Sequence, residues 1–363
     1  MSSSTGDLPP RIADFKRLLD ERAARLGRTV RLMEVCGTHT MQLFRSGIRA
    51  MLPPNVKLLS GPGCPVCVTP MGVIEAAIEI AGLDGVILAT FGDMLRVPGS
   101  ASSLERAKAE GADVRVVYSP LDALKLAEAE PGRRVVFFAI GFETTSPTVA
   151  ATAAYARDRE LANFLLLVAH KLIPPAMVAI LEGGEAHVDG FLCPGHVCVT
   201  IGSVPFEPIA ERYQAPCVVT GFEAEDILEG VAMLLLQLVE ERPTVEIQYK
   251  RWVHREGNRK AQGAIAEVFD VCDTAWRGLG TIPDSGLELK GELTRFDALA
   301  SLGIEPTPEL ENPGCSCGDV LRGVIDPPEC PLFAKQCTPA SPVGPCMVST
   351  EGSCAAFYKY GGH

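Results

Sequence analysis

The sequence predicts an α/β fold, in which parallel sheets are covered by helices on both faces. Short apolar runs alternate with helical patterns over about the first 240 residues, and this rhythm is typical of βαβ units. The runs are apolar throughout rather than alternating, as expected of strands buried on both faces. With 363 residues, of which 47% are hydrophobic and 21% charged, the chain is long enough for two or three domains.

The elements follow in order along the chain. An amphipathic helix opens it, because apolar side chains recur at helical spacing between residues 12 and 26, and Pro9 and Pro10 suit its first turn. A long helix is predicted over 223–241, and the chain after about residue 240 is less periodic. The predicted strands cover residues 30–35, 56–60, 86–90, 114–117, 135–140, 164–169, 188–193 and 217–220.

Three segments echo one another weakly. They are ILATFGDMLRVP (87–98), FFAIGFETTSP (137–147) and VVTGFEAEDIL (218–228), and each has an apolar strand, then Gly and Phe, then an acid. Chance resemblance among strand–turn–helix units explains this pattern. Two related α/β lobes that face one another explain it equally well, and the sequence leaves both explanations open.

The composition excludes several classes of function. The net charge of −12 argues against a protein that binds the phosphate backbone of nucleic acids. No apolar run approaches the ~18–20 residues that span a bilayer. The segment MSSSTGDLPP has no basic or apolar signal region, so a cytoplasmic protein is expected. Its 13 cysteines are then more typical of metal ligands or redox groups than of structural disulfides.

Four candidate sites lie where a predicted strand ends and a helix begins, which is where open α/β sheets bind ligands. The first is Cys36, which His39 follows closely. A helix N-terminus favours the thiolate of a cysteine placed ahead of it, although a lone cysteine there is more often buried and inert. The neighbouring histidine favours a metal or redox role.

The second site is the C-x-x-C motif of Cys64 and Cys67 in GPGCPVC. This spacing is compact enough to close a disulfide or to bind one metal ion. The helix that begins near residue 70 is expected to lower a thiol pKa. A redox dithiol is the preferred interpretation, and half of a zinc site is its rival.

The third and fourth sites are Glu143 and His196. Glu143 projects from a predicted strand end, either as an acid/base group or as an ordinary solvated loop acid. His196, in CPGHV, fits a metal ligand or a proton shuttle, or a loop histidine with local hydrogen bonds. Neither a P-loop nor a strand-linked G-x-G-x-x-G motif occurs, so nucleotide binding is not predicted.

The fifth site is a C-terminal group of six cysteines in a segment rich in Pro and Gly. Such a segment buries little core and is expected to depend on a bound cofactor or metal. Four thiolates suit Zn(II) or a [4Fe–4S] cluster, and the spacing alone does not choose between them. Cys315, Cys330, Cys337 and Cys354 supply four thiolates and leave Cys317 and Cys346 over, and the spacing alone does not choose the four ligands either.

Taken together, these motifs resemble one family closely, the HypD hydrogenase maturation proteins. The matching segments run in family order over nearly the whole chain, and the one noted departure is Met41. They are MEVCGTHT (33–40), GPGCPVC (61–67), TFGDMLRVPGS (90–100), GFETTSPT (141–148), HKLIPPAM (170–177), CPGHV (193–197), TGFE (220–223) and the end from Cys315 through GPCMVSTEGSC (344–354).

The resemblance implies a specific fold and function. It implies two similar α/β lobes that face a cleft, over residues 1–130 and 131–240, and a C-terminal iron–sulfur domain over 241–363. It also implies assembly of the Fe(CN)2CO group of [NiFe]-hydrogenases, together with a HypC-type chaperone and a HypE-type cyanide donor. Neither a nucleic acid nor a membrane is expected as a partner.

The resemblance also assigns roles to residues. Cys36 would hold the iron, Cys64 and Cys67 would be a redox dithiol beside it, and Glu143, His39 and His196 would line the same cleft. The cluster ligands would be Cys315, Cys330, Cys337 and Cys354, for any of which Cys317 or Cys346 might be exchanged.

The chemistry suggests how these groups work together. Iron that carries cyanide suits a soft thiolate anchor, and keeping it low-valent needs electrons, so a relay from cluster to dithiol to iron is expected. The competing interpretations are a stand-alone thiol–disulfide or Fe–S oxidoreductase and a structural zinc protein.

Overall fold

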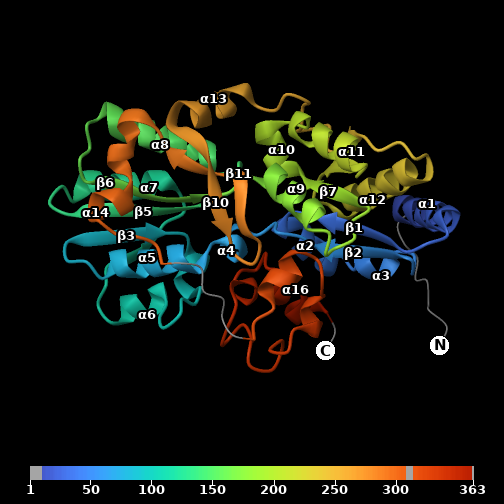
Figure 1. Cartoon of the computed structure of the whole chain (residues 1–363), viewed down its shortest axis with the longest axis horizontal. Helices are drawn as coiled ribbons and strands as arrows, with labels where there is room; N and C mark the ends of the chain where they lie inside the picture. The colour runs from blue at the N-terminus through green and yellow to red at the C-terminus, as the bar shows by residue number, and fades with distance from the viewer. Residues whose placement is uncertain (1–9, 308–313, 362–363) are drawn as a thin grey trace.

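A computed structural model describes residues 10–307 and 314–361, and it confirms an α/β fold with two parallel sheets and a cysteine-rich C-terminal segment. One sheet has the strand order β2-β1-β7-β8-β9, and the other has the order β4-β3-β5-β6. The sheets lie side by side along the long axis, and the C-terminal segment lies beneath the place where they meet (Figure 1). Pro9 and the rest of the N-terminal segment lie outside the described residues.

All eight predicted strands form, each within two residues of its predicted bounds. Three of them, β3, β7 and β8, are buried along their whole length, which is why their sequences are apolar throughout. The eight are β1 (Val30–Glu34), β2 (Val56–Ser60), β3 (Val86–Thr90), β4 (Val114–Val116), β5 (Arg134–Gly141), β6 (Phe164–His170), β7 (Gly190–Pro194) and β8 (Cys217–Thr220).

Helices connect most of these strands and cover both sheets (Figure 1). The predicted first helix is α1 (Pro10–Leu26), and the predicted long helix is α12 (Ala224–Val239). The others are α2 (Gly37–Arg45), α3 (Ile48–Met51), α4 (Pro65–Val68), α5 (Met71–Ala81), α6 (Leu104–Ala109), α7 (Pro120–Ala129), α8 (Ser146–Asp158), α9 (Ile173–Gly183), α10 (Gly195–Ile201), α11 (Glu207–Tyr213), α13 (Arg259–Val268), α14 (Ala298–Leu302), α15 (Cys317–Leu321) and α16 (Ser353–Tyr360), with the 3-10 helices η1 (Gly92–Arg96), η2 (Val204–Phe206), η3 (Gly291–Phe296), η4 (Pro327–Glu329) and η5 (Pro345–Met347).

The two sheets interleave along the chain. Strand β1 pairs on one side with β2 and on the other with β7, so that Leu32 lies opposite Gly190. The strands of the second sheet, β3 to β6, all lie in the part of the chain between β2 and β7. Strand membership therefore does not follow the predicted boundaries at residues 130 and 240. Hydrogen bonding between strands does not require them to be neighbours in sequence.

Three strands after residue 240 were not predicted. Strand β9 (Val245–Ile247) has three half-buried residues, and β10 (Phe269–Trp276) pairs with β11 (Gly280–Leu289) in an antiparallel hairpin. Both hairpin strands have exposed residues among buried ones, so no continuous apolar run marks them. The turn of the hairpin points toward the C-terminal segment (Figure 1).

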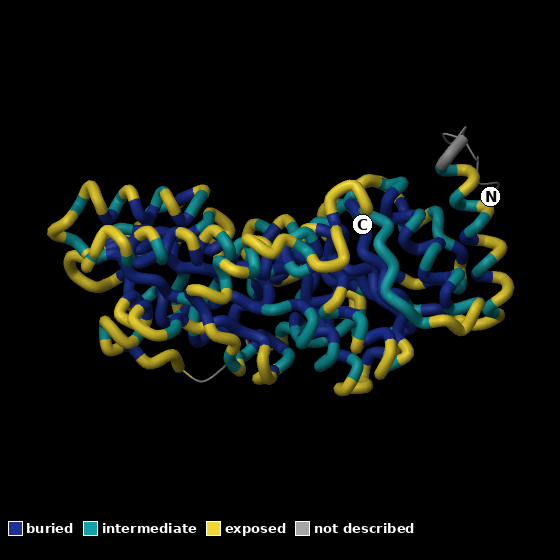
Figure 2. The backbone as a smooth tube through the Cα atoms, turned by 90° about the horizontal axis from the view of Figure 1, so that it is seen from above, coloured by how far each residue is buried: buried dark blue, intermediate teal, exposed yellow. Residues whose placement is uncertain are grey.

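The core lies between the sheets and the helices that cover them, as the buried strands in Figure 2 show. Helices α1 and α12 cover one face of the first sheet, where Leu19 packs with Leu32, Leu192 and Val231. The echoing segments lie at the ends of β3 and β5 in one sheet and of β8 in the other. Across 10–307 and 314–361, no helix is both long and apolar enough to cross a membrane.

Candidate functional site

Cys36 lies between the end of β1 and the start of α2, where it is the N-cap residue. Its side chain is buried, and its backbone N–H donates to Oε2 of Glu34 at 3.1 Å. Burial raises the pKa of the Cys36 thiol to about 12, and the backbone N–H groups of His39 and Thr38 lower it only in part. The start of the helix favours the thiolate, but the net pKa of the unliganded thiol is raised because desolvation outweighs the helix.

Glu34 is a functional candidate that the sequence analysis missed. It is buried at the end of β1, and it accepts hydrogen bonds from the Thr40 hydroxyl and from the backbone of Cys36. Burial raises the pKa of the Glu34 carboxyl to about 8. The sequence signal was an acid at the end of a mostly apolar strand, directly before the cysteine motif. Glu34 thus shapes the loop that presents Cys36.

Cys64 and Cys67 form a disulfide that spans helix α4, with their Cα atoms 5.2 Å apart. The backbone N–H of Cys67 also donates to Sγ of Cys64 at 3.2 Å. Both side chains are almost completely buried. The spacing therefore closes a disulfide, as one of the two interpretations of the motif predicted.

The disulfide loop and the Cys36 loop are in direct backbone contact. The N–H of Gly37 donates to the carbonyl of Gly63 at 2.9 Å. A Cβ atom added to Gly63 would lie 2.2 Å from the backbone nitrogen of Cys36, so that only glycine fits there. The two cysteine motifs follow the neighbouring parallel strands β1 and β2, and these contacts join their loops at one place.

Glu143 lies at the end of β5 and is buried, so the interpretation as a solvated loop acid is wrong. Its Oε1 accepts a hydrogen bond from the backbone N–H of Ile173 at 2.9 Å, and its Oε2 has no hydrogen-bond partner among the described residues. Burial raises the pKa of Glu143 to about 7. Burial is the main reason that the pKa of Cys198 is raised, and the nearby Glu143 and Cys36 raise it further. This buried thiol therefore lies near both.

His39 and His196 both stack on the ring of Phe222, with ring centroids 4.7 and 3.8 Å away. The Nε2 atom of His39 lies 2.9 Å from the carbonyl oxygen of Gly221, and its Nδ1 has no partner among the described residues. Burial lowers the pKa of His39 to about 4 and also lowers that of His196. Both rings are therefore neutral at pH 7, which suits proton transfer or ligand orientation.

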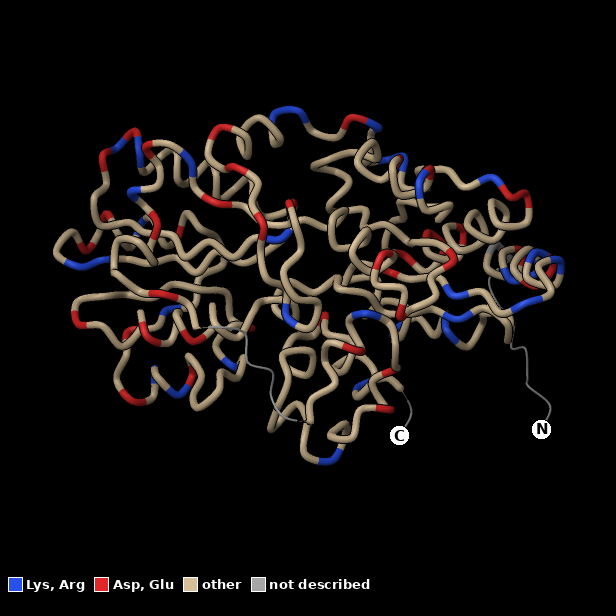
Figure 3. The backbone as a smooth tube through the Cα atoms, viewed as in Figure 1, with Lys and Arg blue, Asp and Glu red and all other residues tan. Residues whose placement is uncertain are grey.

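All six C-terminal cysteines line one cavity, together with apolar side chains such as Val320 and Met347. Few charged residues lie in this segment (Figure 3). The Sγ atoms of Cys317 and Cys346 are 2.9 Å apart. Within the described ranges, no three His, Cys, Asp or Glu side chains converge on one point as they would around a single metal ion.

The other four cysteines surround the cavity. Burial raises the pKa of Cys315 to about 12, and the nearby thiols Cys330 and Cys354 raise it further. Burial likewise raises the pKa of Cys337, and the nearby thiols Cys354 and Cys330 raise it further. Binding of a metal centre would therefore have to displace protons from these thiols.

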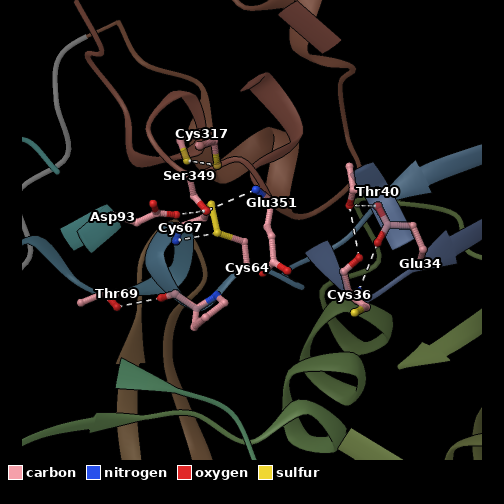
Figure 4. The surroundings of a disulfide bond; sticks show 12 residues. Glu34, Cys36, Thr40, Cys64, Cys67, Thr69, Asp93, Cys317, Ser349 and Glu351 are labelled. Atoms are coloured by element: carbon pink, nitrogen blue, oxygen red, sulfur yellow. Dashed lines mark hydrogen bonds between the residues drawn. A yellow bond between two sulfur atoms is a disulfide. The ribbon is translucent and has the colours of Figure 1, made fainter. Parts of the chain in front are cut away.

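Glu351 connects the C-terminal segment to the Cys36 loop. Its Oε1 accepts a hydrogen bond from the Thr38 hydroxyl at 2.8 Å, and a Cβ atom added to Gly37 would lie 2.5 Å from Cβ of Glu351. Ser349 donates to Oδ2 of Asp93 at 2.9 Å. In the view of Figure 4, Glu351 lies between the disulfide and Cys36. The three sulfur sites are therefore parts of one connected structure.

Comparison with known proteins identifies the family. A family model named HypD, described as "Hydrogenase formation hypA family", matches residues 12–361. The chain is 47% identical to the hydrogenase maturation factor HypD of Escherichia coli, over 97% of this chain and 96% of that protein.

The chain belongs to the HypD family.

Other HypD relatives agree over similar lengths. The hydrogenase expression/formation protein HupD of Azotobacter chroococcum is 49% identical over 92% of this chain and 90% of its own length. HypD of Rhodobacter capsulatus is 45% identical over 97% and 94%. The HypD resemblance seen in the sequence motifs is therefore confirmed, whereas the roles of individual residues stay predictions.

The buried carboxyl of this HypD chain gives a pH-dependent prediction. The ordinary pKa of a glutamate is 4.5, and that of Glu143 is about 7, so between these pH values the folded chain holds a proton that the unfolded chain has lost. The free energy of unfolding therefore falls as pH rises across this window. We expect Glu143→Gln to be more stable than the unchanged chain by about 3 kcal/mol at pH 8 and equally stable at pH 4.

Urea unfolding at the two pH values measures this effect. The matched control is Glu128→Gln on the exposed side of α7, which should change stability by less than about 0.5 kcal/mol at either pH. Equal urea midpoints for Glu143→Gln and the unchanged chain at pH 8 would contradict the prediction.

Proposed function

We propose that this chain is a hydrogenase maturation factor that serves as the scaffold and redox component for assembling an Fe(CN)2CO group. It would act in the cytoplasm with a HypC-type chaperone and a HypE-type cyanide donor. The observation that carries the proposal is the connection of three sulfur sites: the Cys36 loop, the Cys64–Cys67 disulfide and the cysteine-lined cavity. Family membership supports the maturation role.

Iron is the cargo of this scaffold, and Cys36 would hold it. A thiolate is the soft, electron-rich ligand that iron carrying strong-field cyanides requires. The high pKa of the buried thiol means that iron has to replace its proton. Glu34 lies beside this loop, but its pKa near 8 keeps it mainly protonated at pH 7, so the thiol proton has to pass to another group or to water. His39, His196 and Glu143 would then orient diatomic ligands or move protons.

The C-terminal cavity is the place where a [4Fe–4S] cluster would bind, as the family resemblance implies. The thiolates of a cluster bind different irons, so they surround a volume, as these cysteines do. Cys346 contacts both Cys317 and Cys354, so thiol contacts do not choose the ligands, and we assign the cluster to Cys315, Cys330, Cys337 and Cys354 because the family resemblance implies these four. A bound cluster would supply one-electron transfer.

The thiols of Cys317 and Cys346 can reduce the Cys64–Cys67 disulfide by exchange. One of these sulfurs, as thiolate, attacks the disulfide, and the second displaces the mixed disulfide. The new Cys317–Cys346 bond replaces the old one, and the two protons pass to Cys64 and Cys67, so that atoms and electrons balance. Helix α4, which carries Cys67, packs against η5, which carries Cys346.

The alternative of a stand-alone oxidoreductase has less support. A disulfide that turns over small disulfides in solution has to be accessible to them. The side chains of Cys64 and Cys67 are only 3% and 0% exposed. Their reduction therefore fits an internal donor pair better than a free small molecule.

Replacement of one dithiol cysteine tests the proposal. We expect the Cys64→Ala chain, produced with its HypC-type and HypE-type partners, to carry iron without the full set of cyanide and carbon monoxide bands in the infrared spectrum. The matched control is Cys272→Ala, a cysteine on the β10 strand away from the sulfur sites, which should give the full bands. A Cys64→Ala complex with fully cyanated and carbonylated iron would overturn the relay.

A further inference from the structure

A buried arginine lies beside the cluster cysteines. Arg277 is only 5% exposed, and it lines a second cavity together with Cys315, Cys317, Gly318 and Gly344. It comes from neither lobe sheet, because it occupies the turn between β10 and β11. The proposed function gives this residue no role.

The turn that carries Arg277 is held tightly in place. The backbone N–H of Arg277 donates to the carbonyl of Val68 at 2.9 Å, at the end of the helix that carries Cys67. A Cβ atom added to Gly278 would lie 2.3 Å from Cα of Gly318, so the turn contacts the segment of Cys317 backbone to backbone. Arg322 also donates to the carbonyl of Gly278. The hairpin thus holds the guanidinium between the disulfide helix and the cysteine cavity.

A buried guanidinium has a strong electrostatic effect on its surroundings. Arginine stays protonated at every pH that proteins tolerate, and burying its charge is costly unless negative charge lies nearby. Reduction of a [4Fe–4S] cluster adds one negative charge with no change in its ligands. A fixed positive charge in a poorly solvated cavity stabilises that added charge.

We infer that Arg277 is a positioning residue for electron transfer, whose buried charge raises the reduction potential of the cluster held at Cys315. This inference rests on the proposed function only for the presence of the cluster. The electron comes from an external low-potential one-electron donor, for which dithionite serves in the test. The added electron remains on the cluster, and no bond or proton is exchanged at the arginine.

The test is a redox titration of the anaerobically purified full chain, followed by EPR of the reduced cluster. In Arg277→Met the equilibrium constant for one-electron reduction should fall about tenfold or more, which is a potential lower by ~59 mV or more. Arg277→Lys keeps the charge, so its reduction potential should fall by less than half as much as that of Arg277→Met. The control is Arg106→Met, which removes an exposed arginine on α6 that is paired with Glu110 and should change the constant less than twofold.

Each outcome decides the inference. An unchanged potential in loaded Arg277→Met overturns it and leaves the proposed function intact, whereas an unchanged chain that holds no cluster overturns both. If Arg277→Met fails to load and Arg277→Lys loads with a nearly normal potential, the charge is required and the inference stands. If neither variant loads, the residue is structural and the inference fails.

Discussion

Cys36→Ala is expected to leave a folded chain that no longer retains iron. The thiol is the N-cap residue of α2 and makes no side-chain cap hydrogen bond, so its loss should lower the free energy of unfolding by less than about 2 kcal/mol. The proposed iron site, in contrast, loses its only soft ligand from this loop. We expect iron that carries cyanide and carbon monoxide on the purified complex to fall at least ~10-fold, as measured by infrared bands and metal content.

The control for this experiment separates the site from general thiol loss. Cys272→Ala removes a half-buried cysteine from the hairpin and should leave the infrared bands unchanged. A Cys36→Ala complex that retains the cyanide and carbon monoxide bands at full intensity would show that the iron is anchored elsewhere, and the proposed function would lose its scaffold site.

Cys330→Ala should remove the cluster, whereas Cys317→Ala should keep it. Both side chains are buried in the same cavity and the substitutions are chemically identical. Cys330, however, is one of the four assigned ligands, whereas Cys317 contacts Cys346 at 2.9 Å. Iron and acid-labile sulfide should fall from about four of each per chain to below about one in Cys330→Ala, and remain near four in Cys317→Ala.

The same pair of variants tests the ligand assignment. If Cys317→Ala loses iron and Cys330→Ala keeps it, the assignment is wrong and Cys317 belongs to the cluster. Zinc without sulfide in the unchanged chain would replace the cluster by a structural metal site. The Cys317→Ala chain, if loaded, should also fail to reduce Cys64–Cys67, because the exchange needs both thiols.

Much of the fold could be predicted because local signals and the tertiary environment agree. Three of the eight predicted strands, β3, β7 and β8, are buried along their whole length, and most residues of the others are apolar and buried as well. The β10–β11 hairpin has one exposed face and was missed. Its importance is clear only in three dimensions, where its turn contacts both α4 and the C-terminal segment.

The site was predicted in its residue types but not in its electrostatics. Cys36, Cys64 and Cys67 lie together as expected, held by the contact of Gly63 with the Cys36 loop. The protonation of Cys36 depends on burial, which no spacing reports, and its pKa is raised where the helix dipole alone would lower it. Burial also raises the pKa of Glu34, and this effect could not be predicted from the sequence.

The sequence by itself determined the α/β class and the family, because these depend on residue types and on spacing within single segments. Only the tertiary structure decided which segments meet. It joined β1 to β7 across the chain, brought Glu351 onto the Cys36 loop and placed Arg277 beside the cysteine cavity. Such contacts depend on close approach of the backbone and on exclusion of solvent between elements that are distant in sequence. Neither can be predicted from the residues of a single segment.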